Sequence, residues 1–145
     1  MRITRYTDYT LRVLIYLAAD HGRQTTIAEI ADAFSISKSH LMKVVHQLNL
    51  LGYIKTTRGK NGGLSLERSP ADINLGVLFR QTETDLGLVE CFGEGNECRI
   101  TPVCRLKNIL ADAQQAFIET LDQYSLADLV YSGHKPQLLR LLDIA

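Results

Sequence analysis

All three cysteines of this 145-residue chain lie in one short stretch. Cys91, Cys98 and Cys104 are separated by six and five residues, which is not the Cys-x2-Cys spacing of zinc knuckles and ribbons. An odd number of cysteines argues against a disulfide framework, and cytoplasmic cysteines are normally reduced. Three soft thiolates suit zinc or an iron–sulfur cluster. The stretch therefore predicts a thiolate-bound metal centre.

Either metal centre needs a fourth ligand, and the chain has no fourth cysteine. Its four histidines, at positions 21, 40, 46 and 134, are all distant in sequence from the cysteines. An iron–sulfur cluster would take an oxygen or nitrogen donor from elsewhere in the chain or from a second subunit. Such a bond is weak, and a weak bond is where a small molecule attacks. The chemistry favours an iron–sulfur cluster, with zinc and redox-active or purely structural thiols as alternatives.

The cysteines are expected in a loop that leads into a long helix. Residues 83–101 show little hydrophobic periodicity, and a loop of that length is usually functional or disordered. Thr101 and Pro102 predict a helix start, with Cys104 in the first turn, where the helix dipole favours a thiolate. Apolar residues then recur every three or four positions, as expected for a dimerisation helix: Leu106, Leu110, Ala113, Phe117, Leu121 and Tyr124.

The first half of the chain has the pattern of three helices. The first is expected to begin near Thr7 or Asp8, and its apolar residues lie on two faces, which predicts burial on both. Thr26 and Glu29 form a capping box for the second helix. Ser37 is placed to cap the third.

A basic hairpin is expected after these helices, because Asn61–Gly62 is a strong signal for a tight turn in which both residues tolerate positive φ. Three helices and a hairpin in this order predict a winged helix-turn-helix. The expected fold is mainly α with a small β-hairpin wing and a long dimerisation helix. The expected divisions are a DNA-binding domain, a cluster-binding loop, and a dimerisation helix with a C-terminal tail, at residues 1–82, 83–101 and 102–145.

The net charge of zero hides a marked asymmetry. Residues 1–68 carry ten Lys or Arg and five Asp or Glu, whereas residues 69–145 carry six and eleven. Such segregation suggests a polyanion partner for the basic half, with a merely solvated basic surface as the alternative. The second and third predicted helices form the helix-turn-helix. In this motif the later of the two helices, here the one that follows Ser37, enters the major groove of double-stranded DNA. The expected DNA contacts are Lys38, Ser39, His40, Lys43 and Gln47 on that helix, and Arg58, Lys60 and Asn61 on the hairpin.

Other classes of protein receive little support. No apolar run reaches the roughly 18 residues that cross a bilayer, and the first ten residues lack the apolar stretch of a signal peptide. A cytoplasmic location without membrane attachment is the expectation. An enzyme is not expected, because the sequence offers no nucleophile–base pair, phosphate loop or set of convergent carboxylates.

Five segments together resemble the NsrR family, which are nitric-oxide-sensing iron–sulfur repressors within the Rrf-two superfamily of winged-helix regulators. They are TRYTDYTLRVLIYLA, ISKSHLMKVVHQL, TTRGKNGGLSL, ECFGEGNECRITPVCRLK and LDQYSLADLV. The resemblance covers roughly residues 1–131. It is carried most specifically by RGKNGG, ITPVCRLK and LADLV.

This resemblance implies that Cys91, Cys98 and Cys104 bind the cluster and that Asp8 of the partner subunit is the fourth ligand. Taken alone, Asp8 is an ordinary acid near a helix N-terminus. The cluster is expected to be 4Fe–4S, with 2Fe–2S as the alternative because the first cysteine gap is long for the family. The implied protein is a homodimeric repressor that binds a palindromic operator and responds to nitric oxide. A related regulator that senses iron–sulfur or iron status, or a zinc-stabilised DNA-binding protein without gas sensing, is the alternative.

Overall fold

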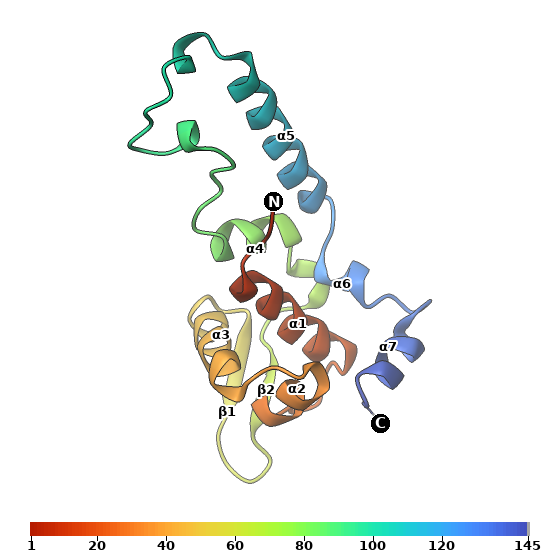
Figure 1. Ribbon diagram of the computed structural model, residues 1–145. Coiled ribbons are helices and arrows are strands. Elements are labelled where there is room, and N and C mark those ends of the chain that lie inside the picture. The colour runs from red at the N-terminus through yellow and green to blue at the C-terminus, as the bar shows by residue number, and fades with distance from the viewer. Residues whose placement is uncertain (145) are drawn as a thin grey trace.

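The computed structural model describes residues 1–144 as a winged-helix body from which one long helix projects (Figure 1). The expected fold class, mainly helical with a two-stranded antiparallel hairpin, is confirmed. The elements in chain order are α1 (Arg5–Ala19), α2 (Ile27–Phe34), α3 (Lys38–Leu50), β1 (Ile54–Thr57), β2 (Gly63–Leu66), η1 (Pro70–Asp72), α4 (Leu75–Thr82), η2 (Glu90–Phe92), η3 (Thr101–Val103), α5 (Arg105–Asp122), α6 (Leu126–Leu129) and α7 (Lys135–Leu141).

Helix α1 lies at the centre of the body and is buried on both faces, as its apolar pattern predicts. It packs against α2, α3 and β2, and also against α4, α6 and α7. The helix begins at Arg5, earlier than the expected start near Thr7 or Asp8. The reason is that the Thr4 hydroxyl accepts a hydrogen bond from the Thr7 N–H at 3.2 Å and so caps the helix immediately before Arg5.

The predicted caps of α2 and α3 are both present. In the capping box of α2, the Thr26 N–H donates to Glu29 Oε2 at 2.7 Å and the Glu29 N–H donates to Thr26 Oγ1 at 3.2 Å. In α3, the His40 N–H donates to Ser37 Oγ at 3.3 Å. These contacts satisfy amides that a helix start leaves unpaired, so the Thr26 box fixes the start of α2 and the Ser37 cap fixes the start of α3.

In the wing, β1 and β2 pair antiparallel. The first residue pair is Ile54 with Leu66, and the last is Thr57 with Gly63. The expected turn conformation at Asn61–Gly62 is wrong, because positive φ angles occur instead at Gly59 and Gly63. Gly62 is needed for a different reason: a Cβ there would lie 2.1 Å from the carbonyl oxygen of Thr57. The tight approach of the two backbones, not the turn conformation, requires glycine at this position.

The C-terminal segment folds back onto the winged-helix body. Leu126 is fully buried, and its N–H donates to the Ile73 carbonyl at 2.8 Å. Leu142 and Ile144 also join the central core. The division of the chain at residues 82 and 101 stays a prediction. Within residues 1–144, no helix combines the length and apolarity that crossing a membrane requires.

Candidate metal centre and nucleic-acid interface

The cysteine loop begins at the end of α4, in the winged-helix body, and ends at the start of α5. It therefore runs along the whole part of the molecule that projects from the body (Figure 1). Cys91 lies in η2 and is half-buried, and Cys98 is exposed. Cys104, also half-buried, is the N-cap residue of α5, with extended backbone and no side-chain capping bond. The expected helix start at Thr101 is therefore wrong. Thr101 and Pro102 instead form a 3-10 turn, and Cys104 precedes the first helical residue.

Polar side chains within the loop give it a defined path. The Glu97 N–H donates to Glu90 Oε1 at 2.6 Å, across the glycine-containing turn. The Cys98 N–H donates to Asn96 Oδ1 at 3.0 Å, and the Cys98 carbonyl accepts from Thr101 Oγ1 at 2.8 Å. Asn96 Nδ2 also donates to Thr101 Oγ1 at 2.8 Å. The backbone of Cys98 is thus held on both sides by polar side chains.

The donor set fits a soft metal centre, because all three cysteines are free thiols. Their present arrangement is open: in residues 1–144 no three His, Cys, Asp or Glu side chains are grouped closely enough to hold a metal ion. That statement includes Asp8, which the chain does not bring to its own cysteines. The loop between the thiols contains only single 3-10 turns, so the thiols can converge without unfolding a long helix.

Asp8 lies in the first turn of α1 and is bound by Arg12. Its Oδ1 accepts from Arg12 Nε at 3.1 Å, and its Oδ2 accepts from Arg12 Nη2 at 2.8 Å. The guanidinium carbon of Arg12 also lies 5.8 Å from the ring centres of Tyr9 and Phe34. The Tyr9 ring in turn lies 6.3 Å from the His40 ring on α3. A continuous set of contacts therefore runs from Asp8 to an expected DNA-contacting residue.

A buried polar network at the root of the loop was not predicted. Glu83 is only 6% exposed, and it accepts from the Thr4 N–H at 2.7 Å and from Thr4 Oγ1 at 2.9 Å. Beside it, Thr7 Oγ1 donates to Thr82 Oγ1 at 2.9 Å. The first residue of the cysteine loop thus anchors the first turn of α1. No sequence signal indicates this, because the partners are 75 and 79 positions apart.

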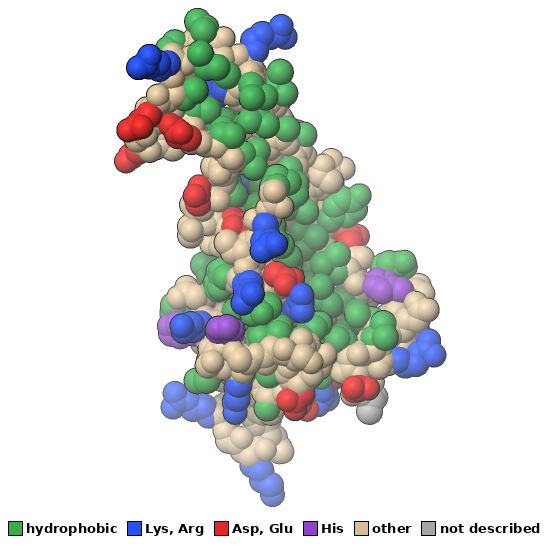
Figure 2. Space-filling model, in the orientation of Figure 1, with side chains coloured by type: hydrophobic (Ala, Val, Ile, Leu, Met, Phe, Trp, Pro, Cys, Tyr) green, Lys and Arg blue, Asp and Glu red, His purple; other side chains and the backbone are tan. Residues whose placement is uncertain are grey.

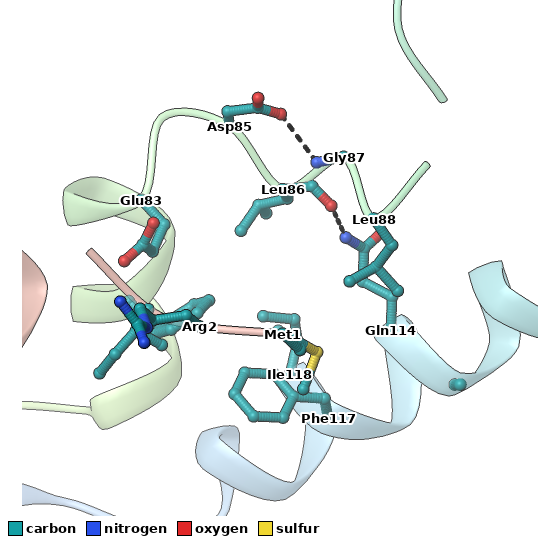
Figure 3. Close-up of a pocket in the computed structure, with 13 residues that line it drawn as sticks. Met1, Arg2, Glu83, Asp85, Leu86, Gly87, Leu88, Gln114, Phe117 and Ile118 are labelled. Carbon is teal, nitrogen blue, oxygen red and sulfur yellow. Dashed lines mark hydrogen bonds between the residues drawn. The ribbon is translucent and has the colours of Figure 1, made fainter. Parts of the chain in front are cut away.

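A cavity of about 350 Å³ lies next to this network (Figure 3). Its walls come from the N-terminal residues, the end of α4, the first part of the loop and α5. Gln114 donates from its side chain to the Leu86 carbonyl, which ties the loop to α5. Phe79 and Phe117 meet edge to face, with ring centres 5.3 Å apart, and join α4 to α5. The loop is thereby attached to both helices that flank it.

The face of α3 that is predicted to contact DNA is exposed. Leu41, Val44 and Leu48 on the opposite face are buried in the core, which fixes the rotation of the helix. Basic side chains gather at the end of the molecule that holds α3 and the wing (Figure 2). The predicted residues on α3 are all exposed: Lys38, Ser39, His40, Lys43 and Gln47.

The wing presents its predicted residues in the same way. Arg58, Lys60 and Asn61 are exposed between β1 and β2. None of them forms an ion pair or a side-chain hydrogen bond within the described part of the chain. Their polar groups are therefore available to a partner, and the structure brings them to the same end of the molecule as α3.

Sequence comparison finds regulators along nearly the whole chain. The Rrf2 family, described as an iron-dependent transcriptional regulator, matches residues 3–132. The HTH-type transcriptional regulator NsrR of Bacillus subtilis is 49% identical over 146 residues, covering 99% of each chain. The NsrR proteins of Geobacillus kaustophilus and Bacillus licheniformis are 54% and 51% identical over 132 residues, covering 90% of this chain and 90% and 92% of theirs.

Solved structures agree in fold. CymR, the global cysteine regulator of B. subtilis, superposes with a TM-score of 0.72 at 27% identity, covering 89% of this chain and 95% of its own. IscR of T. potens superposes with a TM-score of 0.75 at 23% identity, covering 94% of this chain and 91% of its own. The winged-helix body and the projecting helix are thus shared with other regulators.

Proposed function

The chain belongs to the Rrf2 family of helix-turn-helix transcriptional regulators, and within it to the NsrR group, and from this premise we propose how it works. It is a homodimeric repressor that binds a palindromic operator on double-stranded DNA in the cytoplasm. Cys91, Cys98 and Cys104, with Asp8 of the partner subunit, hold an iron–sulfur cluster of the 4Fe–4S type. Nitric oxide is the effector. The observation that carries the proposal is the confinement of all three free thiols to one loop that is anchored to α1.

The donor chemistry supports this assignment. Three thiolates and one carboxylate suit iron, and the carboxylate is the weakest of the four ligands. When bound, the cluster supplies iron atoms that react with nitric oxide. Zinc without gas sensing is the second candidate. It is less well supported, because a structural zinc site prefers four Cys or His ligands and the chain offers three thiols.

Asp8 gives the chain two alternative states. In the structure its carboxylate binds Arg12 in a bidentate ion pair. A metal bound across the subunit interface would take one of these oxygens, so at least one of the two hydrogen bonds from Arg12 would weaken or break. Loss of the metal would let the pair re-form, so the two partners compete for one carboxylate.

The contacts of Arg12 transmit this exchange to the DNA-binding face. Arg12 lies against the rings of Tyr9 and Phe34, and Tyr9 lies beside His40 of α3. Movement of Arg12 would shift the packing of α1 against α3. A change in operator affinity of about 3 kcal/mol is more than a hundredfold in binding. Small displacements of α3 within a dimer are enough for this change, because the distance between the two α3 helices must match the distance between the two half-sites of the operator.

Anaerobic purification and a visible absorption spectrum test the proposal first. Broad sulfur-to-iron absorption, followed by loss of operator binding on titration with nitric oxide, is the expected result. The operator is obtained by selecting duplexes from a random-sequence library with the loaded protein. A colourless protein that contains zinc, even after an attempted reconstitution with iron and sulfide, would contradict the cluster and the gas response but not the DNA-binding function.

A further inference from the structure

Arg68, the second residue after β2, reaches back to the C-terminal end of α3. Its Nη2 donates to the Leu51 carbonyl at 2.8 Å and its Nε donates to the Gly52 carbonyl at 3.2 Å. The last carbonyls of a helix lack partners within the helix and carry partial negative charge. Leu51 is the C-cap residue of α3 and Gly52 follows it, so the guanidinium caps the recognition helix at Leu51 and also binds the next carbonyl.

The same guanidinium is stacked on a buried ring. Its Cζ lies 4.2 Å from the centre of Tyr53, which is 1% exposed. Tyr53 is itself fixed to α3, because its N–H donates to the Leu48 carbonyl at 3.0 Å. Its hydroxyl donates to the Gln81 side chain on α4. Arg68 thus closes a junction of α3, the wing and α4.

This junction fixes the wing relative to the recognition helix. The backbone of Arg68 lies two residues beyond β2, whereas its side chain is bound to the two carbonyls that directly follow α3. Gly52, at φ 79°, turns the chain between α3 and β1 in a backbone conformation that favours glycine. The buried side chains of Ile54, Leu64 and Leu66 also pack the wing against the body, and Arg68 adds a polar link from the segment after β2 to the end of α3.

We propose that Arg68 is a positioning residue that sets the distance between α3 and the wing and thereby the selectivity of the regulator for its operator. It does so without contacting DNA. A sequence-specific site requires the helix and the wing to meet adjacent grooves in one register, whereas non-specific binding requires only phosphate contacts. The inference rests on the proposed DNA-binding surface of α3 and the wing.

A contact of Arg68 with phosphate is the competing explanation, and its chemistry differs. The guanidinium directs two donors at backbone carbonyls and one face at an aromatic ring. Lysine would supply the same charge to a phosphate, but it cannot reproduce two parallel donors and a stacked plane. The two roles therefore predict opposite results for the replacement of Arg68 by lysine.

The test measures binding of the full-length, anaerobically purified protein to two labelled duplexes. One is selected by the wild-type protein from a random-sequence library, and the other is an unselected duplex of the same length. The variants are Arg68→Lys and Arg68→Ala, with Lys60→Ala as the reference for a phosphate contact. Arg140→Ala, on α7, is the control for loss of one exposed positive charge. Circular dichroism and thermal unfolding give the folded fraction by which each concentration is corrected.

Both Arg68 variants are expected to lose about tenfold or more in affinity for the selected duplex, and less than about twofold for the unselected one. The slope of log affinity against log salt should stay at the wild-type value, whereas Lys60→Ala should flatten it by about 0.9. In the Arg68→Ala background the Lys60→Ala penalty should shrink, because a displaced wing no longer contributes fully.

Wild-type affinity and selectivity in Arg68→Lys would overturn the inference. Equal losses on both duplexes with a flattened salt slope would do so as well, because that result identifies a phosphate contact. If the wild-type protein enriched no duplex from the library, the DNA-binding surface itself would be wrong, and the inference would fall with it.

Discussion

At the scale of single residues, α3 separates two kinds of side chain that the sequence places in one segment. Leu41 and Val44 are buried, whereas Lys43 is exposed on the opposite side. This alternation follows from the 3.6-residue period of a helix, so the exposed positions could be predicted from sequence alone. Which base each exposed residue contacts could not, because that depends on the path of the DNA.

The exposed ammonium of Lys43 is expected to contact phosphate. Lys43→Ala should weaken binding to all duplexes to a similar degree and reduce the salt slope by about 0.9, because one fewer counterion is released. Fluorescence anisotropy at several salt concentrations measures both quantities. An unchanged slope would remove Lys43 from the DNA-binding surface.

Asp8 is expected to matter for coupling more than for cluster assembly. Asp8→Ala removes one of four proposed ligands and should retain part of the cluster on the three thiols, while the ratio of DNA affinities with and without cluster falls toward one. Absorption spectra give the cluster content, and anisotropy gives the ratio. A response to nitric oxide equal to that of the wild-type protein would contradict the role of Asp8 of the partner subunit.

At the scale of elements, the sequence predicted those helix caps that are formed by residues close together in the chain. The caps formed by Thr26 and Ser37 lie within three residues of their partners, so the sequence reveals them. The start of α5 was misplaced because Thr101 and Pro102 suit a 3-10 turn as well as an α-helix. The anchoring of Glu83 to Thr4 had no local signal, since only the tertiary fold brings these residues together.

The wing offers a test of close backbone packing. Gly62→Ala should destabilise the protein by about 1–3 kcal/mol, because the new Cβ would overlap the Thr57 carbonyl. Urea unfolding followed by circular dichroism measures the change. Gly93→Ala is the matched control, since a Cβ there meets nothing nearer than 3.9 Å. Equal stability of the two variants would show that the wing accommodates the methyl group.

The capping box of α2 has a defined dependence on pH. The Thr26 N–H donates to the Glu29 carboxylate and, with the Arg23 guanidinium, holds the pKa of that carboxyl below its ordinary value of 4.5. A lowered pKa stabilises the folded state at pH values above the ordinary pKa, and the contribution is lost as the pH falls through the lowered pKa.

Glu29→Gln removes this titration. The difference in unfolding free energy between the wild-type protein and the variant should therefore be largest near neutral pH and shrink at about pH 3. Urea titrations at the two pH values measure it. A difference that is the same at both values would mean that the charge of Glu29 contributes nothing to stability.

At the scale of the whole molecule, charge and apolar surface are segregated. Basic side chains are most frequent over the winged-helix end, although some also lie at the tip of the projecting half, and acidic side chains gather along one part of the cysteine loop (Figure 2). Leu106 and Ile109 on α5 are 59% and 56% exposed, so the projecting helix carries apolar surface that a second subunit would cover. Of these two residues only Leu106 belongs to the seam predicted from spacing, and Phe117 of that seam packs against Phe79 of the same chain. The covering of α5 by a second subunit stays a prediction.

Disruption of that surface should change the assembly. Ile109→Glu is expected to convert the proposed dimer into a monomer and to lower operator affinity, because one subunit meets only one half-site. Sedimentation velocity measures the mass. Leu141→Glu on α7, where the leucine is 80% exposed, is the control and should stay dimeric. A dimeric Ile109→Glu protein would place the subunit contact elsewhere.

The anchoring of the N-terminus has a practical consequence for recombinant work. Thr4 is bound to Glu83, and Met1 lines the same cavity as Phe117 and Ile118 (Figure 3). An affinity tag or cleavage scar placed before Met1 would therefore sit at the base of the proposed sensor. Preparations that differ only in their vector could then differ in colour and in sensitivity to nitric oxide.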